Sequence, residues 1–253
     1  MQTVSLEQAV AMIPDGASLM IGGFMAVGTP ERVVDEIVRQ NKRNLTVIAN
    51  DTASPGRGIG KLIAAKLVHK AIVSHIGLNP ETQRQMTAGE LEVELVPQGT
   101  LIERIRAGGY GLGGVLTQTG IGTTVEKGKQ QIKVDGKTYL LEVALRADFA
   151  LVHAFLVDYL GNVSYALTAR NFNPVVAMAA ATVIVDADNI VHRSDLTEPY
   201  RDARTGSGLP RYECVSSDGT ADRHPTPHCP GTCARNAGES RHWNSHPSRE
   251  LRA

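Results

Sequence analysis

Short apolar runs rich in Val, Ile and Leu alternate with helix-period segments from residue 1 to about residue 191. Such runs are typical of strands buried on both faces, and their alternation with helices predicts βα units. The sequence therefore predicts an α/β domain with an open, largely parallel sheet and flanking helices. The expected strands are Ser18–Gly22, Leu45–Ala49, Ala71–His75, Glu92–Val96, Phe149–Val152 and Thr182–Val185.

Helices are expected between these strands. Ser5 and Gln8 have the spacing of a capping box at the start of a helix over Leu6–Met12. Thr29 is expected to cap the next helix, with Pro30 in its first position. Asp135 and Gly136 predict a hairpin turn between two short strands. Further helices are expected over Ile59–Leu67, Glu81–Ala88, Leu101–Ala107 and Pro174–Ala180.

The chain changes character after Val191. Residues 192–253 contain no Lys, Ile or Phe, yet they hold all three cysteines and the only tryptophan. Without periodic apolar residues such a segment cannot offset its ordering entropy, so we expect a domain over 1–191 and an irregular, mostly disordered tail over 192–253. Out-of-frame translation or a fusion would explain this change.

The tail holds one metal-like pattern, Cys229 and Cys233 followed by His242 and His246. Its central spacer is eight residues, whereas a zinc finger has about twelve and also carries packing apolar residues. We therefore expect no metal site.

Charge and hydropathy exclude two classes of partner. Lys and Arg total 26, as do Asp and Glu, so no net field favours nucleic acid or an anionic membrane. No apolar run approaches the roughly 20 residues of a membrane span, and the first residues lack the pattern of a secretory leader. The expected location is the cytoplasm.

The stretch IGGFMAVGTP, residues 21–30, places Gly22, Gly23, Phe24 and Gly28 between a strand and a helix. Ligands of open α/β sheets bind at the carboxyl ends of strands, where helix N-termini present free N–H groups. The glycines therefore lie where a substrate would bind. A strand-to-helix turn dictated by packing alone remains the alternative.

Five segments together carry a resemblance to a known family. They are DGASLMIGGFMAVGTP at 15–30, IANDTA at 48–53, SHIGLNPET at 74–82, VPQGTLIERIRAGGYGLGG at 96–114 and LTARNFNP at 167–174. This pattern resembles the α subunit of family I CoA-transferases, over about residues 1–191 and most closely the acetate/acetoacetate type. The resemblance implies the CoA-transferase/NagB-like fold.

The resemblance also implies a reaction and a partner. Family enzymes move CoA between carboxylic acids through a nucleophilic glutamate in a Ser-Glu-Asn-Gly motif of the β subunit, and no glutamate here precedes an asparagine. The chain is therefore expected to be half of an enzyme, in an α2β2 or related assembly. CoA is expected as a substrate, without another cofactor.

Gln98 matches the glutamine that donates to the oxyanion in the family. Spacing alone favours a surface residue in a turn, and the resemblance reverses that preference. From their places at strand ends, Gly22, Gly23, Phe24, Gly28 and Asn50 are expected to contact CoA or substrate. We expect Asp51, Ser74 and His75 to lie on the same rim, His75 as a base or as a structural residue.

Gly108, Gly109 and Gly111 indicate a backbone-exposing loop, which lacks the Lys-Ser/Thr ending of a P-loop. It would form a wall near the thioester or pantetheine arm, or else a mobile surface loop. Arg170 could pair with a carboxylate, with CoA phosphates or with a partner subunit.

Two other functions remain open at this point. The chain could be a non-catalytic CoA- or metabolite-binding domain, inactivated by its altered C-terminus. It could also be a sugar-phosphate isomerase of the same architecture, since fold does not fix function.

Overall fold

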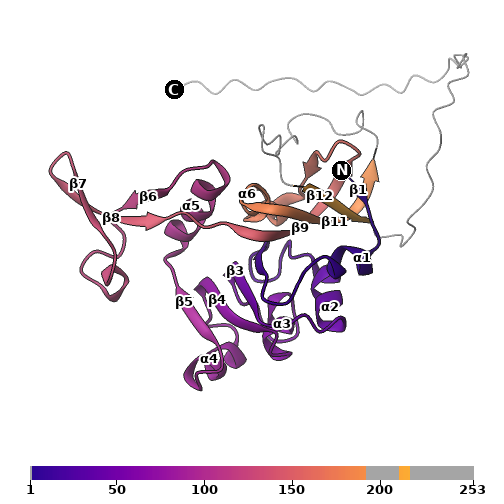
Figure 1. Ribbon diagram of the computed structural model, residues 1–253, viewed down its shortest axis with the longest axis horizontal. Coiled ribbons are helices and arrows are strands. Elements are labelled where there is room, and N and C mark those ends of the chain that lie inside the picture. The colour runs from indigo at the N-terminus through magenta and orange to yellow at the C-terminus, as the bar shows by residue number, and fades with distance from the viewer. Residues whose placement is uncertain (1, 192–210, 217–253) are drawn as a thin grey trace, which may run out of the picture. The chain divides into compact units, whose positions relative to one another are not determined.

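The computed structural model describes residues 2–191 and 211–216. In these residues a nine-stranded sheet has the order β1-β12-β11-β9-β2-β3-β4-β5, with β10 also paired to β9. Figure 1 shows these strands with helices on both sides. The bounds are β1 Gln2–Thr3, β2 Ser18–Ile21, β3 Leu45–Asp51, β4 Val68–His75, β5 Glu92–Leu95, β9 Ala147–Asp158, β10 Val163–Ser164, β11 Ala180–Val191 and β12 Arg211–Ser216.

All the ladders of this sheet are parallel within the described residues, except that between β9 and β10. The prediction of an open, largely parallel sheet is confirmed. The six expected strands are all present, but β9 and β11 each extend to 12 residues. The helices are α1 Leu6–Ala11, α2 Glu31–Arg39, α3 Ile59–Ala64, α4 Pro80–Thr87, α5 Gln98–Gly109 and α6 Asn173–Met178, with 3-10 turns η1 Thr124–Glu126 and η2 Leu167–Arg170.

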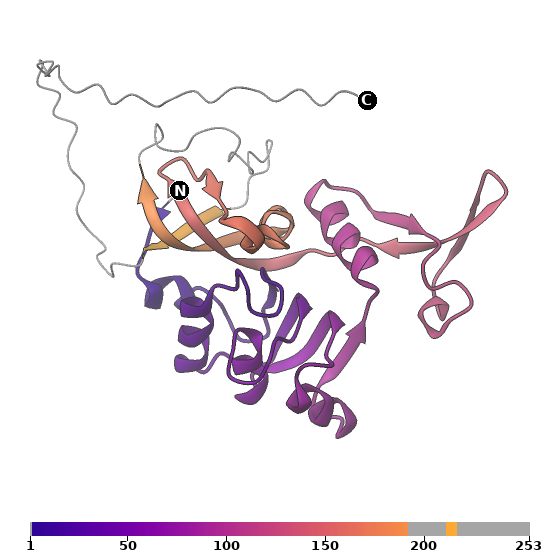
Figure 2. The same ribbon diagram turned by 180° about the vertical axis from the view of Figure 1, so that it is seen from behind.

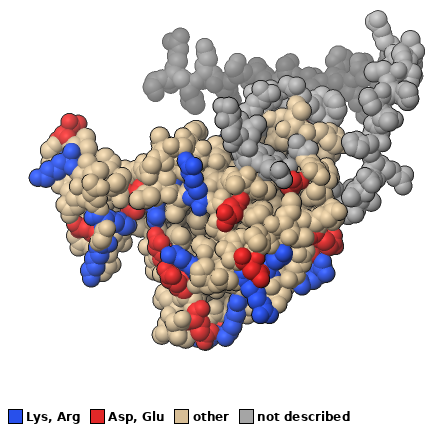
Figure 3. All heavy atoms as spheres, in the orientation of Figure 1, with Lys and Arg blue, Asp and Glu red and all other residues tan. Residues whose placement is uncertain are grey.

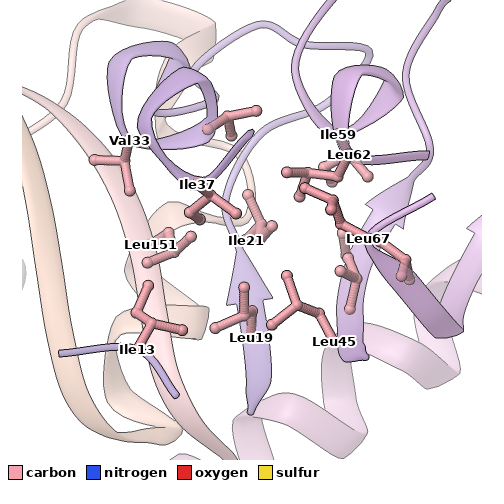
Figure 4. Close-up of a cluster of buried hydrophobic side chains, with 14 of the residues drawn as sticks. Ile13, Leu19, Ile21, Val33, Ile37, Leu45, Ile59, Leu62, Leu67 and Leu151 are labelled. Carbon is pink, nitrogen blue, oxygen red and sulfur yellow. The ribbon is translucent and has the colours of Figure 1, made fainter. Parts of the chain in front are cut away.

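Two hydrophobic cores lie on opposite faces of the sheet. Along β2, Leu19 and Ile21 belong to one core and Met20 to the other, because successive strand residues point to opposite faces. Residues of α1, α2 and α3, together with Ile13 just after α1, complete the first core. Figure 4 shows Ile13, Val33, Ile37, Ile59 and Leu62 of this core beside β2 and its neighbours. Residues of α5 and α6 complete the second. Burial on both faces explains why the strands are continuous apolar runs.

Local helix signals were predictive for α1 and misleading for α2. Ser5 and Gln8 form the expected capping box, each side chain bonding the backbone N–H of the other. The expected cap by Thr29 is wrong, because α2 begins at Glu31 and Pro30 occupies the N-cap. The Thr29 hydroxyl instead donates to the carbonyl of Gly22 at 3.2 Å.

The expectation of a mostly disordered tail is wrong for residues 211–216. These residues form β12, which pairs in parallel with both β11 and β1. Cys214 and Val215 are buried, one in each core. Burial, followed by the charge of Asp186, raises the pKa of the Cys214 thiol to about 12. The zinc-like residues Cys229, Cys233, His242 and His246 lie outside the described residues, as does the rest of the tail.

A second, antiparallel sheet follows α5. Its order is β6-β8-β7, with β6 Gly114–Thr117, β7 Gln131–Val134 and β8 Lys137–Val143. The predicted hairpin turn is confirmed, since Asp135 and Gly136 both have positive φ between β7 and β8. In both ribbon views these strands extend beyond α5 (Figures 1 and 2).

Surface charge is mixed rather than gathered by sign. In the face shown in Figure 3, Lys and Arg alternate with Asp and Glu over the described residues. Ion pairs join side chains of opposite sign, such as Arg84 with Glu81 and Glu90. Among the described residues, no helix is both long and apolar enough to cross a membrane.

Candidate functional site

The glycines after β2 are required by close packing. A Cβ at Gly22 would lie 1.9 Å from the Asn173 Oδ1, and one at Gly23 would lie 2.1 Å from the Thr29 Oγ1. Gly28 has φ +73°, and its Cβ would lie 2.6 Å from the Ala169 carbonyl oxygen. The packing alternative thus accounts for the bare backbone at all three positions, and contact of these glycines with CoA or substrate stays a prediction.

Two asparagines hold this loop, one just before α6 and one in its first position. The Asn171 Oδ1 accepts from the N–H of Gly23 at 3.1 Å, and its Nδ2 donates to the carbonyl of Val27 at 2.9 Å. The Asn173 Nδ2 donates to the carbonyl of Gly28 at 2.8 Å. The motifs at 21–30 and 167–174, far apart in sequence, therefore form one structural unit.

The tip of the loop is exposed and conformationally unusual. Phe24 and Met25 are 42% and 45% exposed, which is high for large apolar side chains. Met25 and Ala26 have φ of 50° and 69°, in the left-handed region that non-glycine residues seldom adopt. The N–H of Met25 donates to the Asp51 Oδ2 at 2.9 Å, so β3 holds the tip in this conformation.

Gln98 and Asn50 come together at the carboxyl edge of the sheet. Gln98 begins α5, and its Nε2 donates to the Oδ1 of Asn50 at 2.7 Å. Asn50 is buried, and its Nδ2 donates to the Asp51 Oδ2 at 2.6 Å. The hydroxyl of Ser74, on β4, donates to the Asn50 carbonyl at 2.7 Å. Asn50 therefore uses its polar atoms to hold neighbouring protein groups, and its predicted substrate contact is not tested by this geometry.

A pocket of about 340 Å³ opens beside Gln98. Its walls combine apolar side chains with amides and one guanidinium, the composition of a small-molecule site. The pocket lies between α5, the loop after β2 and the start of α6. It is lined by Phe24, Gln98, Gly99, Ile102, Arg106, Asn171, Phe172 and Val175.

Sequence reasoning identified only part of this lining. Gln98 and Phe24 were predicted, whereas Ile102 and Arg106 were not. A signal for them exists, since residues 98, 102 and 106 are spaced by four and share one face of α5. Arg106 also forms an ion pair with Glu103, with its Nε 3.1 Å from the Oε2.

The prediction of a loop at Gly108, Gly109 and Gly111 is wrong for Gly108 and Gly109. Gly108 and Gly109 lie in the last turn of α5. A Cβ at Gly108 would lie 1.9 Å from the Leu145 carbonyl oxygen, and one at Gly109 would lie 2.8 Å from the Met178 Cβ. Gly111 follows the helix with φ +75° and open space around its Cβ position. None of the three lines the pocket. Their contact with CoA stays a prediction.

His75 and Arg170 also lie outside the pocket lining. His75 ends β4 and pairs in register with Asp51 on β3, and its side chain is exposed. Arg170 ends η2, one residue before Asn171. Their suggested roles stay hypotheses.

The pocket can bind and polarise a ligand, but its lining carries no nucleophile. None of its eight residues has a carboxylate, thiol, hydroxyl or imidazole. A side-chain amide has two N–H donors, and Asn50 occupies one of those of Gln98. The other can donate to an oxygen in the pocket. Within the described residues, no cluster of His, Cys, Asp and Glu could hold a metal ion.

Comparison with known proteins identifies the family. The model of a family described as Coenzyme A transferase matches residues 3–200. This chain belongs to the coenzyme A transferase family. It is 54% identical over 193 residues to the acetate CoA-transferase subunit alpha of Escherichia coli (strain K12), covering 76% of this chain and 88% of that protein.

A second relative and a solved structure extend the comparison. The chain is 54% identical over 188 residues to the acetoacetyl-CoA:acetate/butyrate CoA transferase alpha subunit of Clostridium acetobutylicum, covering 74% of this chain and 86% of that protein. The crystal structure of a single-residue variant of the decarboxylase AibA/AibB matches with a TM-score of 0.69 and 27% identity, covering 87% of this chain and 84% of that one.

Proposed function

We propose that this chain is the α subunit of a two-component CoA-transferase that moves CoA between short-chain or 3-oxo acyl-CoA and a carboxylic acid such as acetate. The observation that carries this proposal is a pocket with a fixed amide donor, Gln98, and no nucleophile in its lining. The two relatives named above are themselves alpha subunits. A β subunit supplies the missing nucleophile, in an assembly of two copies of each chain.

The reaction needs a nucleophilic carboxylate and a hydrogen-bond donor for the thioester carbonyl oxygen, which becomes negatively charged during the attack. The β-subunit glutamate attacks the thioester carbonyl, and collapse of the adduct releases the CoA thiolate and leaves an acyl anhydride. The thiolate then attacks the glutamyl carbonyl, which releases the carboxylic acid and leaves a glutamyl-CoA thioester. The acceptor carboxylate then attacks the glutamyl-CoA thioester, and the same steps in reverse give the new acyl-CoA and regenerate the glutamate. The free N–H of Gln98 stabilises the negative charge that develops on the carbonyl oxygen.

The pocket favours small acyl groups with an apolar part. Phe24, Ile102, Phe172 and Val175 provide apolar surface, while the amides of Gln98 and Asn171 provide polar contacts. The proposal requires CoA as a substrate and no other cofactor. Its expected location is the cytoplasm.

The test is the consumption of acetoacetyl-CoA in the presence of acetate, with this chain alone, with the β subunit of an acetate CoA-transferase alone, and with both. Activity only in the mixture is the expected result. Activity of this chain alone would contradict the proposal, because the nucleophile would then lie within it. Binding of the two chains without activity would favour the non-catalytic alternative, and release of CO2 would favour a decarboxylase.

A further inference from the structure

Asp51 lies at the centre of the hydrogen bonds that join the loop after β2 to Gln98. Asp51 is the last residue of β3 and is 5% exposed. The Oδ1 accepts from the N–H of Ala53 at 2.7 Å. The Oδ2 accepts from the N–H of Met25 at 2.9 Å and from the Nδ2 of Asn50 at 2.6 Å. One carboxylate oxygen therefore contacts both the loop and the residue that holds Gln98.

These bonds dictate the orientation of two amides. A carboxylate oxygen accepts, so the Asn50 side chain must turn its Nδ2 toward Asp51. Its Oδ1 then faces the Nε2 of Gln98 at 2.7 Å and the Ser74 hydroxyl at 3.2 Å. Were Asn50 flipped, its NH2 group would face the NH2 group of Gln98, and neither could accept.

We propose that Asp51 is a positioning residue for the reaction. It orients Asn50, Asn50 in turn orients Gln98, and the second N–H of Gln98 is thereby kept available to the substrate oxygen. Because Asp51 also holds Met25, the same group fixes the neighbouring pocket residue Phe24. This inference rests on the proposed function, in which Gln98 donates to the thioester oxygen.

The kinetic test compares Asp51→Ala with Asp51→Asn in the complex with the β subunit. Loss of the donor itself lowers kcat by about 100- to 1,000-fold, and we expect Asp51→Ala to lower it by about tenfold or more. KM should rise by a smaller factor, because the loop that carries Phe24 is also released. Asp51→Asn can turn its Oδ1 toward Met25 and Asn50, although its Nδ2 cannot accept from the N–H of Ala53. It should therefore restore kcat in part, to a value clearly above that of Asp51→Ala. A charge-dependent role would instead make both variants equally slow and would overturn the proposal.

Non-additivity tests whether Asp51 acts through Gln98. In a Gln98→Ala background, Asp51→Ala should lower kcat by much less than in the wild type, because Gln98 is already gone and only the bond to the loop that carries Phe24 remains to be lost. A multiplicative loss would overturn the proposal. If Asp51→Ala does not fold, Asn50→Ala takes its place in the same cycle, since it breaks the next link.

The chain offers a matched control in Asp158. This buried carboxylate also accepts from two backbone N–H groups and one asparagine side chain. The backbone N–H groups of Leu160 and Asn162 each donate to its Oδ1 at 2.9 Å, and the Nδ2 of Asn162 donates to its Oδ2 at 2.6 Å. It lies at the turn between β9 and β10 and does not line the pocket. We expect Asp158→Ala to lower stability but leave kcat within about twofold. An equal loss of kcat in Asp158→Ala would overturn the proposal.

A measurement on this chain alone separates the inference from the proposed function. The two Nε2 protons of Gln98, assigned in ¹H–¹⁵N spectra by their absence in Gln98→Ala, should be dispersed because one is bonded to Asn50. In Asp51→Ala they should move to the positions of a solvated glutamine, and in Asp158→Ala they should not. Unmoved resonances in Asp51→Ala would overturn the positioning role. An inactive wild-type complex with the expected spectra would contradict the proposed function alone.

Discussion

Two glycine-rich stretches of similar composition have different structural roles in this chain. The first places Gly22, Gly23 and Gly28 in a loop that Asn171 and Asn173 hold beside the pocket. The second, residues 108–114, ends a helix and starts a strand. From the sequence, both were interpreted as backbone exposed near the substrate, with a turn dictated by packing as the alternative for the first stretch and a mobile surface loop as the alternative for the second.

The difference shows what glycine density indicates. Glycine is favoured wherever another group approaches the backbone closely or φ is positive, whatever the approaching group is. At Gly22 the group is the Asn173 side chain, and at Gly108 it is the Leu145 carbonyl. Glycine-rich sequence therefore predicts close approach, and only the three-dimensional contacts distinguish packing from ligand binding.

The largest effect is expected for Gly28→Ala. The new Cβ would lie 2.6 Å from the Ala169 carbonyl oxygen and 2.9 Å from its Cα, both backbone atoms, at φ +73°. Overpacking and the left-handed conformation together should lower the free energy of unfolding by about 2–5 kcal/mol, measured by urea denaturation. Activity with the β subunit should fall too, since the loop carries Phe24. A stability equal to that of the wild type would show that the loop does not depend on this packing.

Gly108→Ala should have a smaller effect. Its Cβ would lie 1.9 Å from the Leu145 carbonyl oxygen, a clash of about 1–3 kcal/mol, but alanine favours the helix by up to about 1 kcal/mol. Because the contact is with a backbone oxygen, the clash lies at or above the upper end of this range, and we expect a net loss of about 2–3 kcal/mol in the same denaturation experiment, with the KM for acyl-CoA unchanged. A KM raised several-fold with unchanged stability would mean that the second stretch also contacts CoA.

The sheet was predictable from the sequence, because its strands are buried on both faces. Continuous apolar runs such as Leu45–Ala49 mark such strands, and no tertiary information is needed to find them. β12 was missed for the opposite reason. Arg211–Ser216 is short and lies in a segment without an apolar period, and it is a strand because it pairs with β11 and β1.

The site was predictable only in part, for a related reason. The resemblance supplied Gln98, and the strand ends supplied Asn50, but their hydrogen bond joins residues 48 positions apart. The error at Thr29 has the same origin, because its hydroxyl bonds the Gly22 carbonyl across the loop instead of capping α2. Local propensity gave no indication of these long-range contacts.

Gly111→Ala should affect stability less than Gly108→Ala. No atom lies within 4 Å of the added Cβ, so the cost comes only from φ +75°, about 1–2 kcal/mol. The KM for acyl-CoA should not change, because Gly111 does not line the pocket. Gly111→Asn is the matched control, since asparagine tolerates this conformation better and should recover part of the loss. If Gly111→Asn recovered none of the stability, backbone strain would not be the cause.

The smallest effect is expected for Gly113→Ala. Gly113 is exposed and has open space around its Cβ position, with no positive φ, so alanine meets neither a clash nor strain. The free energy of unfolding should stay within about 0.5 kcal/mol of the wild type. Because stability is unchanged, this variant gives the cleanest kinetic test of the second stretch. If acyl-CoA KM rose several-fold, the methyl group would be blocking a ligand, and the two glycine-rich stretches would both border the substrate after all.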